Sequence, residues 1–215
     1  MAAEEPLDLS DGAETDWSSM PTWGAERTIR AVVLQRLLSE SQWPVHAKGV
    51  RLRGVRISGL LDLESVCLRC PLVCEDCYFD SPKPITLDFS TASRVAFLRC
   101  SLAGLTGDTC VITKELDLTG SLFSPGLVQL SDAEIAGHLS FSGAKVTGAD
   151  ADGVALFADR LKASGAFLDE GFAASGAVRL PEAEIAGHLS FSGAKVTGAD
   201  ADGVALFAQG LKARS

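Results

Sequence analysis

Four closely spaced cysteines form the clearest chemical pattern in this sequence. Cys67, Cys70, Cys74 and Cys77 follow the spacing C-x2-C-x3-C-x2-C. Four thiolates at such spacing are typical of a zinc site or an iron–sulfur cluster, although common zinc motifs have a longer loop between the two pairs. The spacing therefore leaves two interpretations open, a metal centre and reduced cysteines buried in a protein core.

Two acidic loops raise a second chemical possibility. The sequence ADADG occurs at residues 149–153 and again at residues 199–203. Neighbouring aspartates suggest calcium, but each loop lacks the third acid and the terminal glutamate of a helix-loop-helix calcium site. We therefore interpret both loops as turns that lengthen a corner of the chain.

Motifs of common enzymes do not occur in the sequence. It contains no phosphate-binding loop, dinucleotide fingerprint, H-E-x-x-H or nucleophile elbow. Its 3 histidines offer little general acid–base chemistry. We expect a protein that is not an enzyme, with no catalytic, cofactor-binding or metal-ligating residues and no bound cofactor.

An internal repeat organises the second half of the chain. The segment from Ala133 to Ala158 recurs without change from Ala183 to Ala208, at an offset of 50 residues. A fixed offset of this size indicates stacked structural repeats, because each unit must bury its apolar face against its neighbours.

Within the repeat, apolar residues come in triplets with an outward-facing middle residue. Alternation with period two predicts very short strands, and Gly or Ser between the triplets predicts tight corners. The steps between triplet starts are five, six and five residues in Val128-Gln129-Leu130, Ala133-Glu134-Ile135, Leu139-Ser140-Phe141 and Ala144-Lys145-Val146, and also in Val50-Arg51-Leu52, Val55-Arg56-Ile57, Leu61-Asp62-Leu63 and Val66-Cys67-Leu68. Four such edges predict a square coil of roughly 23 to 26 residues, with about seven coils from Val50 onward.

These coils predict where the chemical residues lie. Cys67 is an outward middle residue and the other three cysteines fall at a corner or inside, so the coil scatters them. His138 and His188 lie two coils apart at a solvent-facing corner, about 9.6 Å from one another, too far to share a metal ion. The outward residues form three expected columns of mixed charge: Arg51, Gln129 and Arg179; Arg56, Glu134 and Glu184; Lys145 and Lys195.

The triplets resemble those of pentapeptide-repeat proteins. More closely, the segments GVRLRGVRISGLLDLES, CPLVCEDCYF and GHLSFSGAKVTG resemble a family of actinobacterial repeat proteins whose members often carry the label of membrane-associated oxidoreductase. The resemblance implies an all-β fold, a right-handed quadrilateral β-solenoid. It also implies two alternative functions, an oxidoreductase component at a membrane and a DNA mimic that acts on type II topoisomerases.

The N-terminal region has a different pattern. Residues 1–22 are acidic and predict a flexible tail, in which Trp17 is loosely ordered or docks on a partner. From Glu26 to Ser41 the apolar residues follow a helical period, with Ile29, Val33 and Leu37 on one face. We expect residues 23–47 to form an α-helical cap on a solenoid of residues 48–215. A helix lying on a membrane surface is the alternative.

Composition limits the location and the partners. The net charge of −9 argues against direct binding to nucleic acid. The N-terminus lacks the basic and apolar regions of a secretory signal, and no apolar run reaches the length of a membrane span. These features predict a cytoplasmic protein, with possible peripheral membrane association through the helix.

The last residues predict self-association. Val204, Leu206 and Leu211 would form an exposed apolar end of the solenoid, which predicts a homodimer through the uncapped C-terminal coil or a missing C-terminal portion. We expect the function of a binding or scaffold module that contacts protein partners.

Overall fold

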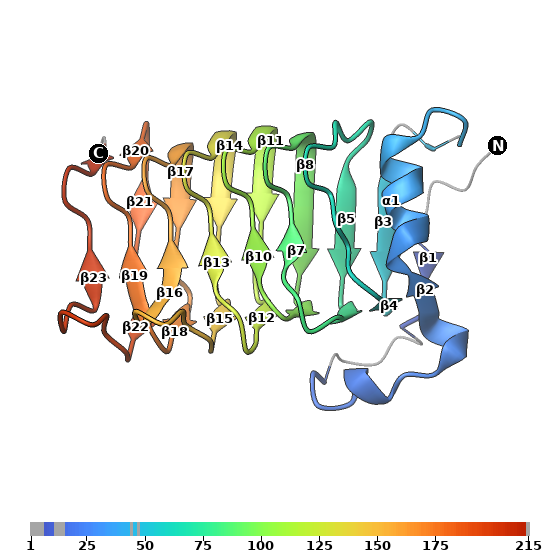
Figure 1. Ribbon diagram of the computed structural model, residues 1–215, viewed down its shortest axis with the longest axis horizontal. Helices are drawn as coiled ribbons and strands as arrows, with labels where there is room; N and C mark the ends of the chain where they lie inside the picture. The colour runs from blue at the N-terminus through green and yellow to red at the C-terminus, as the bar shows by residue number, and fades with distance from the viewer. Residues whose placement is uncertain (1–6, 11–15, 44, 47, 214–215) are drawn as a thin grey trace.

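Short parallel strands stack along one axis, as the triplets predicted. In the computed structural model, which describes residues 7–10, 16–43, 45–46 and 48–213, they build a mostly β solenoid of about six turns (Figure 1). About seven coils were expected. The first coil is incomplete on one side, where Asp62 forms only an isolated bridge with Thr86.

Three parallel sheets run the length of the solenoid. Sheet A has 10 strands: β1 (Leu7–Asp8), β3 (Val50–Arg53), β5 (Leu72–Glu75), β8 (Thr91–Leu98), β11 (Val111–Asp117), β14 (Glu134–Ser140), β17 (Lys162–Phe167), β20 (Glu184–Ile185), β21 (Leu189–Ser190) and β24 (Lys212–Ala213). Sheet B has 8 strands: β2 (Thr28–Arg30), β4 (Arg56–Ser58), β6 (Tyr78–Asp80), β9 (Ser101–Leu102), β12 (Leu122–Phe123), β15 (Lys145–Val146), β18 (Ala173–Ala174) and β22 (Lys195–Val196). Sheet C has 6 strands: β7 (Ile85–Thr86), β10 (Leu105–Thr106), β13 (Val128–Gln129), β16 (Val154–Phe157), β19 (Ala177–Arg179) and β23 (Leu206–Phe207).

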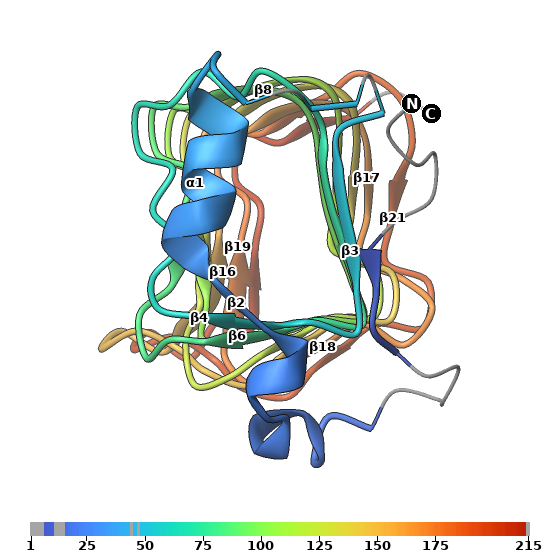
Figure 2. The same cartoon turned by 90° about the vertical axis from the view of Figure 1, so that its right-hand side faces the viewer.

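Seen along its axis, the solenoid has a four-sided outline (Figure 2). Sheets B and C form one side each, and sheet A forms two sides because its strands bend at β-bulges, for example between Ile112 and Glu115. Each of the four expected triplets therefore forms one side. The first and third residues of each triplet are buried and the middle residue points outward, as Ala133, Glu134 and Ile135 illustrate. The buried residues form one continuous apolar core.

Two of the four corners depend on residues with left-handed backbone conformation. Nine non-glycine residues have φ between 49° and 58°. Six of them stack at the corner before sheet A, where the N–H of each donates to a carbonyl of the next coil: Ser65, Phe89, Thr109, Asp132, Arg160 and Glu182. The other three, Asp76, Arg99 and Glu170, share the corner between sheets A and B with glycines, including Gly54 and Gly143. The expected glycine corners are thus confirmed only in part.

Coil lengths vary more than the spacing predicted. Paired residues on successive coils are 20 residues apart at Thr86 and Thr106, but 28 residues apart at Glu134 and Lys162. The next coil, from Lys162 to Glu184, is short again. One long and one short coil together span the offset between the two copies of the repeat, because Glu134 and Glu184 are equivalent residues. The 50-residue offset between the copies therefore corresponds to two coils.

The register corrects two of the expected outward columns. Arg56 shares its column with Lys145 and Lys195, through intermediate strands of sheet B. Arg51 lies in the column of Ser140. The triplets from Val50 have the same five-six-five steps as those from Val128. However, Val50 lies in register with Leu139 of sheet A, two sides of the solenoid beyond Val128, and the steps alone do not show on which side a series of triplets begins.

The N-terminal helix is shorter than predicted. A 3-10 turn, η2 (Ala25–Arg27), and strand β2 precede α1, which spans Ala31–Ser39. Its buried residues are Ala31, Leu34 and Leu38, which join the solenoid core, whereas the predicted face residue Val33 is 40% exposed. The shift arises because Thr28–Arg30 pairs with β4 and covers the edge of sheet B. No helix in the described ranges is long and apolar enough to cross a membrane.

Parts of the acidic N-terminal segment contact the solenoid, although its composition predicted a flexible tail. Strand β1 pairs with β3 and covers the edge of sheet A. The indole nitrogen of Trp17 donates to the carbonyl of Arg99 at 3.3 Å, and the Lys145 ammonium lies 5.1 Å from the Trp17 ring centroid. Met20, in the 3-10 turn η1 (Met20–Thr22), is fully buried.

Candidate functional site

The six cysteines divide into one surface thiol and five core thiols. Cys67 is exposed, as its outward position predicted, and Cys70, Cys74, Cys77, Cys100 and Cys110 are buried. Among the residues that the structure describes, no group of three or more potential ligands is arranged to hold a metal ion. The C-x2-C-x3-C-x2-C spacing therefore does not produce a four-sulfur site.

Two of the buried thiols donate hydrogen bonds to backbone carbonyls, one within its own coil and one on the preceding coil. Cys77 Sγ donates to the carbonyl of Glu75 at 3.2 Å, and Cys100 Sγ donates to the carbonyl of Cys74 at 3.4 Å. Burial raises the pKa of Cys100, and it raises the pKa of Cys110 to about 12. Cys100 and Cys110 therefore stay protonated at neutral pH and pack as small apolar groups.

His138 and His188 face solvent two coils apart, as expected, but they lie at the bend of sheet A rather than at a corner between sheets. Phe167 lies between them, with ring centroids 5.5 Å from His138 and 5.8 Å from His188. The imidazole of His138 covers Gly165 so closely that a Cβ there would meet Nδ1 at 2.8 Å. The two histidines are therefore parts of a row of aromatic rings on the wall, in edge-on and tilted contact with Phe167, and not of one ligand set.

The ADADG loops are turns, as predicted. Asp150 Oδ1 accepts hydrogen bonds from the N–H groups of Asp152 and Val154, at 2.9 and 2.8 Å. Asp200 Oδ1 accepts the equivalent pair from Asp202 and Val204. Because these carboxylates satisfy the backbone of their own turn, they are not gathered around a cation position. Each loop lengthens its coil at the corner between sheets B and C.

The sequence interpretation missed a ladder of alternating charge on sheet A. The outward column continues from Glu134 to Lys162, Glu184 and Lys212 on four successive coils. Lys162 Nζ lies 2.7 Å from Glu134 Oε1, and Lys212 Nζ lies 2.6 Å from Glu184 Oε1. Glu134 and Glu184 were correctly assigned to one column. Lys162 and Lys212 were overlooked, because they fall outside the exact repeat.

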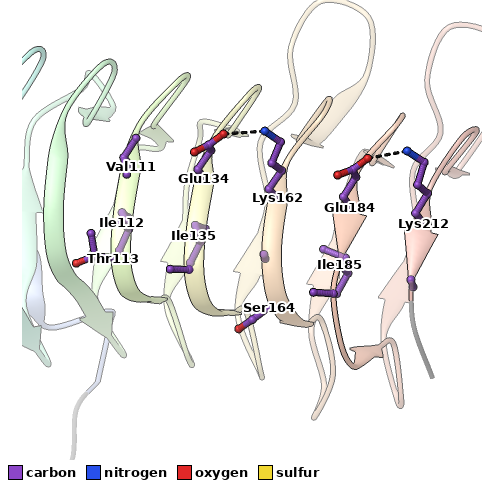
Figure 3. A pocket seen from close by; sticks show the side chains of 14 residues that line it. Val111, Ile112, Thr113, Glu134, Ile135, Lys162, Ser164, Glu184, Ile185 and Lys212 are labelled. Carbon is purple, nitrogen blue, oxygen red and sulfur yellow. Dashed lines mark hydrogen bonds and ion pairs between the residues drawn. The ribbon is translucent and has the colours of Figure 1, made fainter.

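A hollow of about 640 Å³ lies beside this ladder on the outer wall (Figure 3). Small residues form a second outward column along it, namely Thr113, Ala136, Ser164 and Ala186. Glu134 accepts a hydrogen bond from Lys162 and thereby raises the pKa of that lysine. The hydrogen bond from Lys212 lowers the pKa of Glu184, so each of these shifts favours the charged form of its residue. The wall here combines a charged ridge with a shallow depression.

Equivalent residues in the two copies of the repeat show how much more exposed the second copy is at the C-terminal end of the solenoid. Leu156 in the first copy is 1% exposed, whereas the equivalent Leu206 in the second copy is 48% exposed. Phe141 is fully buried, and the equivalent Phe191 is only partly buried. The coil from Leu161 to Leu180 covers the first copy. Only Leu211, Lys212 and Ala213 of the described chain lie over the second.

At the other end, α1 presents apolar side chains to solvent. Val32 is 44% exposed and Val33 is 40% exposed. Arg30 and Arg36 are also exposed at the same helix. This small surface is apolar with basic neighbours, unlike the acidic rest of the chain.

Comparisons with known proteins found no family model, no curated protein and no solved structure that matches this chain.

Proposed function

We propose that this β-solenoid is a non-enzymatic binding or scaffold module that acts through protein–protein contacts. The observation that carries the proposal is the distribution of reactive side chains. The thiols are buried in the core or isolated on the surface, the aspartates of the loops bond to their own turns, and the histidines stack with a phenyl ring. Extended walls of regularly spaced side chains are typical contact surfaces of repeat proteins.

The finer architecture belongs to the same proposal. We infer a right-handed, quadrilateral solenoid like that of pentapeptide-repeat proteins, in which α1, β1 and β2 together serve as the N-terminal cap. Burial of Leu34 and Leu38 against the core supports this role for the helix. A covered N-terminal end leaves the opposite end and the walls for partners.

We further propose that the C-terminal end pairs with that of a second copy. The difference between Leu156 and Leu206 supports this, because identical sequence is covered in one place and open in the other. The N-terminal end is already covered, so the two copies must meet end to end through equal surfaces. Such an isologous contact, acting alone, closes as a homodimer.

Size-exclusion chromatography with light scattering tests the end contact, in a buffer of high salt that screens contacts between charged side chains. The Leu206→Glu variant should lose this contact because it places a charge in the apolar face, and Leu156→Glu serves as the control that instead unfolds the interior. Loss of the end contact in Leu206→Glu supports the proposal. The same association state in Leu206→Glu and in the wild type contradicts it.

The non-enzymatic proposal has its own test. Purified protein should carry no stoichiometric metal, flavin or nicotinamide by elemental analysis and absorbance spectroscopy. A bound cofactor would favour the oxidoreductase alternative. A DNA mimic should inhibit DNA supercoiling by a type II topoisomerase, but the alternating signs of Glu134, Lys162 and Glu184 do not resemble a continuous row of phosphates.

Peripheral membrane association is a second candidate function, supported by the exposed Val32 and Val33 beside Arg30 and Arg36. Flotation with vesicles containing anionic lipid tests it. Binding that is lost in Val32→Glu and in high salt would support this candidate, and no binding to any vesicle would reject it.

A further inference from the structure

The charge ladder on sheet A has a symmetry that points to its partner. From the N-terminal side, Glu134, Lys162, Glu184 and Lys212 carry charges of alternating sign on four successive coils. Reversing the direction of the column exchanges every sign. The column is therefore complementary to an antiparallel copy of itself.

The spacing of the ladder restricts which partners can match all four charges. Adjacent strands of a sheet lie about 4.8 Å apart, so like charges in this column repeat about every 9.6 Å. Side chains on one face of an extended peptide lie about 6.8 Å apart, and those on one face of a helix repeat about every 5.4 Å, so neither matches the interval of about 4.8 Å as closely as another stack of coils. A second solenoid of the same chain has the same interval by construction.

The surroundings of the ladder allow close approach. Thr113, Ala136 and Ala186 are small exposed residues in the neighbouring column, and they line the hollow of about 640 Å³ (Figure 3). Small side chains let two sheet faces come near one another, and the hollow has room for the lysine and glutamate side chains of an opposing wall. The ladder side chains are more than half exposed in three of four cases, at 57% for Lys162, 54% for Glu134 and 76% for Lys212. They are therefore accessible to a partner.

We propose that this wall pairs with the same wall of a second copy, the two solenoids running antiparallel. Glu134 of one copy lies opposite Lys212 of the other, and Lys162 lies opposite Glu184. A twofold axis between Lys162 and Glu184 generates all four contacts. This inference rests on the proposed function only in treating the wall as a contact surface, and it uses a different surface from the end contact.

Charge reversal tests the wall contact without ambiguity. One variant, Lys162→Glu with Lys212→Glu, makes the column wholly negative, and the other, Glu134→Lys with Glu184→Lys, makes it wholly positive. Both are made in the Leu206→Glu background so that the end contact does not contribute. Circular dichroism and thermal unfolding establish that each variant is folded.

The Leu206→Glu protein should form a dimer in low salt that dissociates as salt screens the ion pairs. The dissociation constant of each reversed variant alone should be at least about tenfold higher, because like charges then face one another. An equimolar mixture of the two variants should restore a dimer of unlike chains, which native mass spectrometry detects. The inference is overturned if Leu206→Glu is monomeric in low salt, if reversal leaves association unchanged, or if the folded variants fail to associate when mixed. Failure of the wall contact leaves the end contact intact, because the latter is measured in wild-type protein by its sensitivity to Leu206→Glu.

Discussion

Substituting the same phenylalanine in both copies of the repeat measures what one additional coil contributes to stability. Phe141 is fully buried, and its ring centroid lies 5.9 Å from that of Phe172 and 6.4 Å from that of Phe123. Phe191 has the same sequence neighbours but is only partly buried in the last coil. Any difference between Phe141→Ala and Phe191→Ala therefore reports the position in the solenoid and not the local sequence.

The expected losses differ severalfold. A Phe→Ala substitution in a closed core costs about 3–5 kcal/mol, because apolar contact is lost and a cavity remains. Over Phe191 the described chain continues only as far as Ala213, so the substitution leaves a more open surface instead of a closed cavity. We expect a loss of about 1–2 kcal/mol there, from reduced apolar burial alone.

Urea unfolding followed by far-ultraviolet circular dichroism measures both losses. The experiment is run at a low and a high protein concentration, since end-to-end pairing would bury Phe191 and make its loss grow with concentration. Phe141→Ala should show no such dependence. Equal losses for the two variants at low concentration would refute the argument that the last coil is open.

Three further predictions concern single residues. Gly137→Ala should destabilise the fold by about 2 kcal/mol or more, because its Cβ would lie 1.9 Å from the carbonyl oxygen of Lys114. Gly59→Ala should cost only about 1 kcal/mol, because Gly59 has φ of 88° but nothing lies within 4 Å of its Cβ. Urea unfolding measures both losses. A thiol reagent should modify only Cys67 in the native protein and all six cysteines after unfolding, and rapid labelling that persists in Cys67→Ser would contradict this. Burial raises the pKa of Cys110 from 9.0 to about 12, so between these pH values the folded state keeps a proton that the unfolded state releases. The contribution of this thiol to stability is complete below pH 9 and falls as the pH rises toward 12. Cys110→Ala should therefore reduce the loss of stability with pH in urea titrations across this range.

Much of the solenoid was predictable because its strands are so short. In a triplet such as Ala133-Glu134-Ile135 the direction of each side chain follows from alternation alone, so burial, the outward Cys67 and the turns at Asp150 and Asp200 could be deduced without knowing which coils touch. The pairing of strands could not. It depends on the length of every coil, and those lengths differ even between neighbouring coils.

The charge ladder was missed for this reason. Lys162 lies in a short coil with little sequence identity to the repeat, and only the strand register places it between Glu134 and Glu184. The N-terminal region was misjudged for a different reason. Ile29 continues the helical apolar spacing of Val33 and Leu37. However, the open edge of β4 offers Thr28–Arg30 backbone hydrogen bonds that a helix at this place would leave unused.

The pairing of one long coil with one short coil has a consequence for how such a molecule can change in length. Because the sequence repeats only after both coils, duplication or deletion of a 50-residue segment would return the chain to the same side of the tube with its corners aligned. Loss of a single coil would instead interrupt the alternation of long and short coils. The rod should therefore lengthen or shorten in increments of about 9.6 Å, with each increment adding or removing one acidic and one basic rung on its outer wall.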